Sequence, residues 1–95
     1  MKAAVCEKPK AIWQVKVIET AKVGPNDVLI KIHAGGFCYT DIHLTEGAFG
    51  NMLQFPCVFG HEPVGGVIAI GKAVKSRKLG DWVGVGWVRD SCGRC

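Results

Sequence analysis

The sequence has no apolar run long enough to span a bilayer, and its first residues, Met1-Lys2-Ala3-Ala4-Val5, lack the apolar stretch of a signal peptide. These absences predict a cytoplasmic protein without a membrane partner. There is also no long basic stripe with interleaved aromatic residues, which excludes a nucleic-acid partner. Lys72, Lys75, Arg77 and Lys78 gather in one glycine-flanked segment. We interpret it as a solvated loop, with an anion-facing segment as the alternative.

Repeats, low-complexity segments and a Gly-x-Gly-x-x-Gly dinucleotide fingerprint are also missing. The glycines of residues 60–66 have neither the spacing nor the setting for that fingerprint. The chain does have the composition of a globular domain, with 48% hydrophobic and 21% charged residues. A single domain of 95 residues buries only about 60% of its unfolded surface, so a bound metal or partner would help to stabilise it.

The five cysteines are an odd number, and in a reducing compartment they favour metal ligation or burial over disulfides. They are Cys6, Cys38, Cys57, Cys92 and Cys95. Cys6 ends an apolar segment, so we expect it to be a small core residue. Cys92-Gly93-Arg94-Cys95 has the Cys-x-x-Cys spacing of two ligands of a structural zinc, with a redox dithiol as the alternative.

Several short strands with glycine-rich turns and hardly any helix predict a small barrel-like all-β unit. We expect strands over residues 2–7, 13–20, 28–34, 64–72 and 82–88, one short helix over residues 40–44, and a loop over residues 49–59. In the second strand Lys16 and Glu19 should face water. In the third, Val28, Ile30 and Ile32 should share one face.

Reactive side chains concentrate in two short segments, residues 35–43 and 60–62. Zinc prefers thiolate and imidazole ligands, which makes Cys38 and His61 candidates for one shared metal site. Each is accompanied by a carboxylate. Asp41 could accept the second N–H of the imidazole, and Glu62 could stabilise the metal charge. Taken singly, Cys38 could instead be a buried apolar thiol and His61 a surface loop residue.

Thr40 and His43 strengthen the interpretation of these segments as one site. A hydroxyl and an imidazole three residues apart on one helical turn can form a proton path that leads outward. His33, by contrast, belongs to a strand face that we expect to be half exposed, so it is not a candidate site residue.

The motifs of the chain, in their order, resemble the N-terminal part of the zinc-dependent medium-chain alcohol dehydrogenases. The resemblance rests on residues 36–43, 60–62, 80–83 and 92–95, together with Gly65, Gly66 and Gly71. Residues 87–92 are most similar to the microbial and cinnamyl-type branches. The resemblance implies a mainly β fold over residues 1–95, a GroES-like partly open β-barrel with one short helix that is incomplete at its C-terminus. The family's Rossmann cofactor domain would lie outside the chain.

Members of this family are oxidoreductases that transfer a hydride between a primary or secondary alcohol and NAD or NADP. The resemblance therefore implies a small-molecule alcohol or aldehyde as substrate and a homo-oligomer for the full-length enzyme. By position, Cys38 and His61 would be catalytic zinc ligands, with Glu62 beside the zinc. Thr40 would take the alcohol proton, and His43 would pass it toward solvent.

Four further roles follow from the same resemblance. Asp41 would support the zinc ligands, and Cys92 and Cys95 would be two of four structural-zinc ligands. Tyr39 stands where the family often has a histidine or arginine that contacts the cofactor pyrophosphate. Phe49 would lie near the substrate pocket, with a core position as the alternative.

The third catalytic zinc ligand, the other two structural cysteines and the cofactor fingerprint of the family have no counterpart in the sequence. We therefore expect the 95-residue chain to be inactive by itself. The alternative hypothesis is a non-catalytic GroES-like zinc-binding or interaction module. A co-chaperonin function would rest on fold analogy alone.

Overall fold

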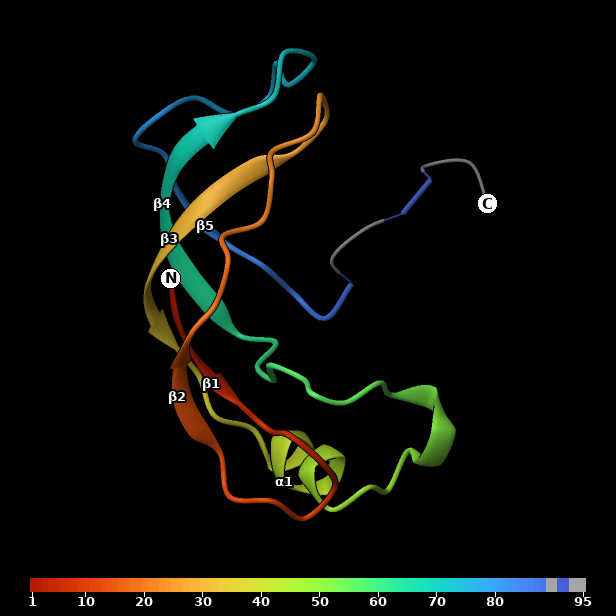
Figure 1. The fold of residues 1–95 in the computed structure, drawn as a ribbon. Coiled ribbons are helices and arrows are strands. Elements are labelled where there is room, and N and C mark those ends of the chain that lie inside the picture. The colour runs from red at the N-terminus through yellow and green to blue at the C-terminus, as the bar shows by residue number, and fades with distance from the viewer. Residues whose placement is uncertain (89–90, 93–95) are drawn as a thin grey trace. The chain divides into compact units, whose positions relative to one another are not determined.

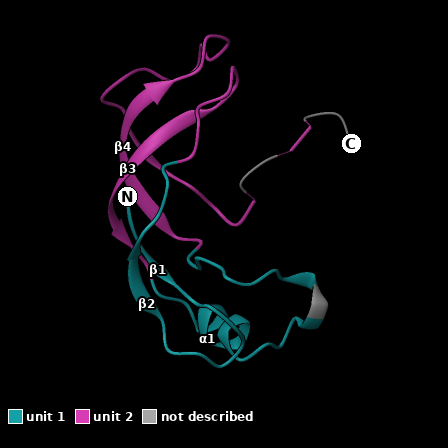
Figure 2. Ribbon diagram, viewed as in Figure 1, with its two compact units in different colours: residues 1–20, 37–60 teal, residues 21–36, 61–95 magenta. Residues whose placement is uncertain are grey.

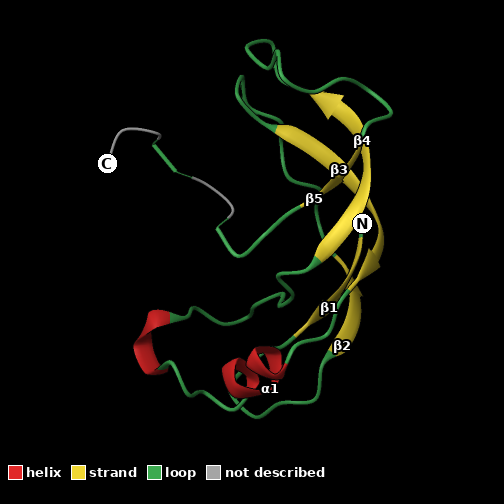
Figure 3. Cartoon of the chain, turned by 180° about the vertical axis from the view of Figure 1, so that it is seen from behind, coloured by secondary structure: helices red, strands yellow, loops and turns green. Residues whose placement is uncertain are grey.

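The computed structural model describes residues 1–88, 91 and 92. Its chain divides into two compact units (Figure 2). Unit 1 comprises residues 1–20 and 37–60, and unit 2 comprises residues 21–36 and 61–95. Strands predominate, as Figures 1 and 3 show. In the described part of the chain, no helix has both the length and the apolar character needed to cross a membrane.

Unit 1 contains a two-stranded antiparallel sheet and the α-helix. Strand β1 (Lys2–Val5) pairs with β2 (Gln14–Val17), in a register that places Lys2 opposite Val17. Helix α1 (Tyr39–Thr45) and the short 3₁₀-helix η1 (Gly50–Met52) follow. The expected helix is confirmed, and η1 interrupts the expected loop. The buried apolar residues of this unit are Val5, Cys6 and Leu44, so the prediction that Cys6 lies in the core is also confirmed.

The faces of β2 differ from a simple inside and outside pattern. Lys16 is partly exposed, as expected, and it forms an ion pair with Glu7. Val15 and Val17 are nevertheless 74% and 79% exposed. A two-stranded ribbon has few neighbouring strands to cover either face, so the valines here reflect strand propensity and not burial.

Unit 2 contains a three-stranded antiparallel sheet in the order β3-β4-β5. Its strands are β3 (Val28–Gly35), β4 (Pro63–Ile70) and β5 (Trp82–Gly84). Among the described residues of this unit, Val67 of the central strand has a buried apolar side chain, at 2% exposure, and Gly65 of the same strand is also buried. The basic segment that contains Lys72, Lys75, Arg77 and Lys78 is exposed, as expected for a solvated loop.

Burial along β3 does not alternate from residue to residue. Val28, Leu29 and Ile30 are all half-buried, whereas Ile32 is 54% exposed. The register against β4 shifts twice, with Ile68 as the extra residue on β4 at the first shift and His33 as the extra residue on β3 at the second. Because β3 has no extra residue between Val28 and Ile32, the prediction that Val28, Ile30 and Ile32 share one face stays a prediction.

The last strand is also shorter than expected, because it ends at Gly84 and not at Val88. Gly84 pairs with Val64, and beyond this pair the Val85 N–H donates to the Pro63 carbonyl at 3.1 Å, but proline has no N–H with which to continue the ladder. The mainly β architecture with one short α-helix is confirmed. In the described residues, neither sheet closes on itself as a barrel.

Candidate functional site

Helix α1 begins with a reciprocal pair of hydrogen bonds between Cys38 and Asp41. The Asp41 carboxylate oxygen Oδ2 accepts the backbone N–H of Cys38 at 3.1 Å, and the Asp41 N–H donates to the Cys38 carbonyl at 3.0 Å. A carboxylate three residues after the N-cap can satisfy an amide that the helix leaves unpaired. Asp41 is only 1% exposed, so this contact also defines the backbone that carries Cys38.

The first turn of α1 brings three of the predicted site residues together. The Cys38 thiol donates to the Thr40 hydroxyl with a sulfur to oxygen distance of 3.6 Å, and both side chains are half-buried. His43 lies three residues beyond Thr40 and is exposed. Because residues three apart share one helix face, the turn leads from a half-buried hydroxyl to an exposed imidazole.

Tyr39, the predicted cofactor contact, is 72% exposed. Its ring packs against His43 one turn later, with 5.2 Å between the ring centroids. Phe49 is also exposed, at 39%, which does not agree with the core alternative for this residue. Its role near a substrate pocket stays a prediction.

The other end of α1 is held by residues that the sequence analysis missed. The indole Nε1 of Trp13 donates to the Thr45 hydroxyl at 2.9 Å, and that hydroxyl donates to the Asp41 carbonyl at 2.7 Å. Trp13 also packs against Phe37 and Phe59. All of these partners lie far from Trp13 in sequence, and the possible signal was a tryptophan at the start of the second predicted strand.

A groove of about 1010 Å³ lies within unit 1, and Trp13 and Thr45 are among the residues that line it. Its lining residues are Lys10, Trp13, Phe37, Ile42, Thr45, Glu46 and Ala48. None of the predicted ligands or proton-transfer residues belongs to this set. The groove is therefore a feature of the helix surface and not of the predicted site.

In unit 2, Gly36 allows the backbone to approach Glu62 closely. The Gly36 N–H donates to the Glu62 carbonyl at 3.0 Å, and a Cβ at position 36 would lie 3.0 Å from the Glu62 side chain. Any larger residue would therefore push against this carboxylate. Gly60, which precedes His61, has a φ of +116°, a conformation that favours glycine.

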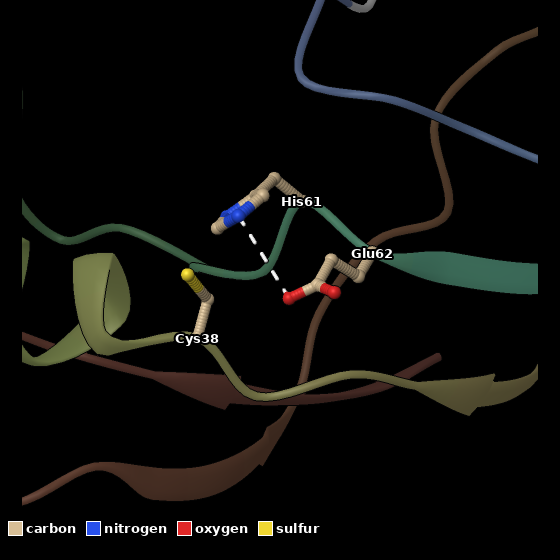
Figure 4. Close-up of side chains that lie close together, drawn as sticks. All are labelled: Cys38, His61 and Glu62. Carbon is tan, nitrogen blue, oxygen red and sulfur yellow. Dashed lines mark ion pairs between the residues drawn. The ribbon is translucent and has the colours of Figure 1, made fainter.

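His61 lies on the link into β4, and Figure 4 shows it together with Glu62. The imidazole Nε2 is 3.9 Å from the Glu62 carboxylate oxygen Oε2. Trp87, another residue that the sequence analysis missed, packs edge-on against His61 with 4.6 Å between the ring centroids. The imidazole is half-buried, while Glu62 is exposed. Both residues thus belong to one local cluster.

The structure describes only part of the predicted structural zinc site. Cys92 is exposed, and Cys95 lies outside the described residues. Cys38, on the link into α1 (Figure 4), belongs to unit 1, and His61 and Glu62 belong to unit 2.

By residue type, Cys38 offers a thiolate, His61 an imidazole nitrogen and Glu62 a carboxylate oxygen. This donor set fits zinc and does not fit the all-oxygen preference of magnesium or calcium.

Comparison with known proteins decides the family. Residues 24–95 match the model of the alcohol dehydrogenase GroES-like domain. The chain belongs to this family. The chain is 42% identical over all 95 residues to an alcohol dehydrogenase of Geobacillus stearothermophilus. It spans only 28% of the length of that relative.

Solved structures agree with this assignment. The GroES-like domain superposes on a CAD from Helicobacter pylori complexed with NADP(H), with a TM-score of 0.89, 35% identity and coverage of 99% of this chain and 27% of the other. It also resembles zinc-dependent alcohol dehydrogenase 2 of Streptococcus pneumonia, with a TM-score of 0.85, 29% identity and coverage of 100% and 27%. The expected GroES-like fold is therefore confirmed.

Proposed function

We propose that the GroES-like domain supplies the zinc-binding and proton-transfer residues of an alcohol dehydrogenase. The complete enzyme would transfer a hydride between a primary or secondary alcohol and NAD or NADP. The proposal is supported by the family and by the contact between the Cys38 thiol and the Thr40 hydroxyl. The contact supports a role in which the Thr40 hydroxyl, beside the proposed thiolate ligand, would accept the proton of the alcohol.

Cys38 and His61 would be catalytic zinc ligands, with Glu62 beside the metal. The covalent chain supports this assignment, because Cys38 follows two residues after Gly36, which is hydrogen-bonded to Glu62. The two peptide units that join Gly36 to Cys38 keep the Cα atoms of these residues within about 7.6 Å of each other. Asp41 would hold the ligand geometry through the Cys38 backbone. Zinc, when bound, supplies a Lewis acid that polarises the oxygen of the alcohol.

Side chains of the protein would then transfer the proton of the alcohol. Thr40 would hold the substrate hydroxyl and take its proton, and His43 would pass that proton to solvent. The half-buried position of Thr40 and the exposed position of His43 support this direction of transfer. Tyr39 would contact the cofactor and Phe49 the substrate, and most of the cofactor would be bound by a Rossmann domain outside these 95 residues. Cys92 and Cys95 would bind a second, structural zinc.

The same proposal includes the setting of the enzyme. The substrate would be a small alcohol or aldehyde, the complete enzyme a cytoplasmic homo-oligomer, and neither nucleic acid nor membrane a partner. The isolated chain would be inactive, because hydride transfer needs the cofactor that the Rossmann domain would bind.

Zinc content tests the ligand assignment. The test uses a chain with Cys92 and Cys95 replaced by serine, so that the structural pair cannot bind the metal. After zinc loading and dialysis, this chain should retain about one zinc, the stoichiometry of a single catalytic site. Cys38→Ser and His61→Asn should each lose most of it, whereas the matched control Cys57→Ser should not. Equal zinc in the Cys38→Ser and Cys57→Ser chains would favour the non-catalytic module.

Activity tests the proton path in a complete enzyme that contains this domain. Thr40→Ala should lower kcat/KM by about 10²-fold to 10⁴-fold, the usual contribution of a positioned proton-transfer group. Thr40→Ser keeps the hydroxyl and should retain most of the activity. If both variants lose activity equally, Thr40 has a packing role and does not take the proton.

A further inference from the structure

Two cysteines outside the proposed metal sites lie directly opposite each other in unit 1. Cys6 and Cys57 form an isolated antiparallel β-bridge. The N–H of each donates to the carbonyl of the other, and both hydrogen bonds measure 2.8 Å. The segment before Phe59 is thus held to the end of β1 by this one pair of residues.

The bridge brings the two Cα atoms within the range of a disulfide, while the Cβ atoms of directly opposite residues are about 4.5 to 5.5 Å apart and must approach to the roughly 3.5 to 4.5 Å of a disulfide, which makes such a bond readily reducible. Residues that exchange both hydrogen bonds in an antiparallel pair have Cα atoms about 5.5 Å apart, within the range of about 4.4 to 6.8 Å found for disulfides. Directly opposite residues also project their side chains to the same face. Burial is the main cause of the raised pKa of Cys57, and the nearby Cys6 thiol adds to it.

Exposure distinguishes the two thiols. Cys6 is completely buried, and its thiol donates to the Lys8 carbonyl at 3.2 Å. Cys57 is half-buried and is the one that a solution reagent can reach. One accessible thiol and one protected thiol are the arrangement in which the first reacts with an oxidant and the second resolves the product.

We propose that Cys6 and Cys57 form a reversible intramolecular disulfide with a low-molecular-weight disulfide such as oxidised glutathione. The Cys57 thiolate attacks one sulfur of oxidised glutathione, which forms a mixed disulfide and releases one glutathione thiolate. The Cys6 thiolate then attacks Cys57 Sγ and releases the second. The two cysteine protons go to the two departing glutathiones, so one oxidised glutathione becomes two reduced ones.

The cross-link would close a covalent loop from residue 6 to residue 57, which includes helix α1 and Cys38. Such a loop restricts the unfolded chain, so oxidation should raise the melting temperature of unit 1. This inference does not depend on the proposed dehydrogenase function, since neither cysteine belongs to the proposed zinc sites.

The test uses the 95-residue chain with Cys38, Cys92 and Cys95 replaced by serine. Incubation with oxidised glutathione should remove both remaining thiols and lower the mass by two hydrogens without a glutathione adduct. Peptide mapping should find Cys6 joined to Cys57, and dithiothreitol should reverse the reaction. The same chain with Cys57→Ser as well should not form a cross-link.

A comparison with the denatured chain protects the test against variants that fail to fold. The native unsubstituted chain should form the Cys6 to Cys57 cross-link at a lower ratio of oxidised to reduced glutathione than the same chain in urea, because folding holds the thiols together. An equal or higher ratio would overturn the proposal. A stable glutathione adduct on Cys57 or an intermolecular dimer would also overturn it.

Discussion

The carboxylate of Asp41 accepts the backbone N–H of Cys38 at 3.1 Å, so the residue that begins α1 is held by a side chain one turn further on. The Asp41 side chain is buried and its acceptor faces the helix start. Through this contact, the backbone at the proposed thiolate ligand depends on the stability of the first helical turn.

Asp41→Ala should lower the free energy of unfolding by about 1 kcal/mol, the usual cost of losing a helix-capping contact. Asp41→Asn keeps an acceptor oxygen and should cost less. Urea denaturation followed by far-ultraviolet circular dichroism measures both. Glu19→Ala, at an exposed position after β2, is the control and should change stability by less than about 0.5 kcal/mol. A cost for Asp41→Ala no larger than this control would contradict the capping role.

Trp13 and Thr45 should be energetically coupled. Trp13→Phe keeps an aromatic ring against Phe37 and Phe59 but removes the N–H that donates to the Thr45 hydroxyl. In a double-mutant cycle with Thr45→Val, we expect a coupling energy of about 0.5 to 1.5 kcal/mol, the net value of one hydrogen bond. Thermal or urea unfolding of the four chains gives this number. Strictly additive losses would show that the contact contributes nothing.

Gly65→Ala should destabilise unit 2 by about 1 to 3 kcal/mol, because overpacking displaces backbone. An added Cβ at position 65 would lie 2.0 Å from the Lys31 carbonyl oxygen of the neighbouring strand. Gly35→Ala is the matched control in the same sheet, since nothing lies within 4 Å of a Cβ there. Urea denaturation should separate the two variants. Equal free energies of unfolding for the Gly65→Ala and Gly35→Ala variants would mean that β3 and β4 move apart around the new Cβ without a loss of stability.

The pH dependence of the reaction between iodoacetamide and the Cys57 thiol should report a raised pKa for this thiol. Burial, and secondarily the nearby Cys6, raises the pKa of Cys57 above its ordinary value of 9.0. The thiolate fraction of the native chain should therefore keep increasing at pH values where the urea-denatured chain has levelled off. Mass spectrometry of the Cys57 peptide measures both rates. Superimposable pH profiles for native and denatured chains would rule out the shift.

The same shift predicts the pH dependence of stability. The folded state holds the Cys57 proton more tightly than the unfolded state, so its contribution to stability is fully present below pH 9.0. It is lost as the pH rises through the higher pKa of the folded state. Cys57→Ser should therefore reduce the loss of stability above pH 9.0, and unchanged loss would assign it to other groups.

Some elements could be predicted because their signals are local. Gly36 and Gly47 bracket the short polar segment that became α1, and Gly24-Pro25-Asn26-Asp27 separates β2 from β3. The buried position of Cys6 followed from its place at the end of an apolar strand. The exposure of residues along β3 could not be predicted, because the two register shifts arise from pairing with β4 and leave no local signal in the sequence.

The sequence by itself determined the family, the donor types of the proposed metal site, and the spacing of Thr40 and His43 on one turn, because these depend on residue identity and short separations. Only the tertiary structure decided what supports them. Trp13 reaches Thr45 across 32 residues, and Cys6 meets Cys57 through a single bridge. Such contacts depend on how distant backbone segments pair, and hydrophobic periodicity along one segment carries no information about its partner.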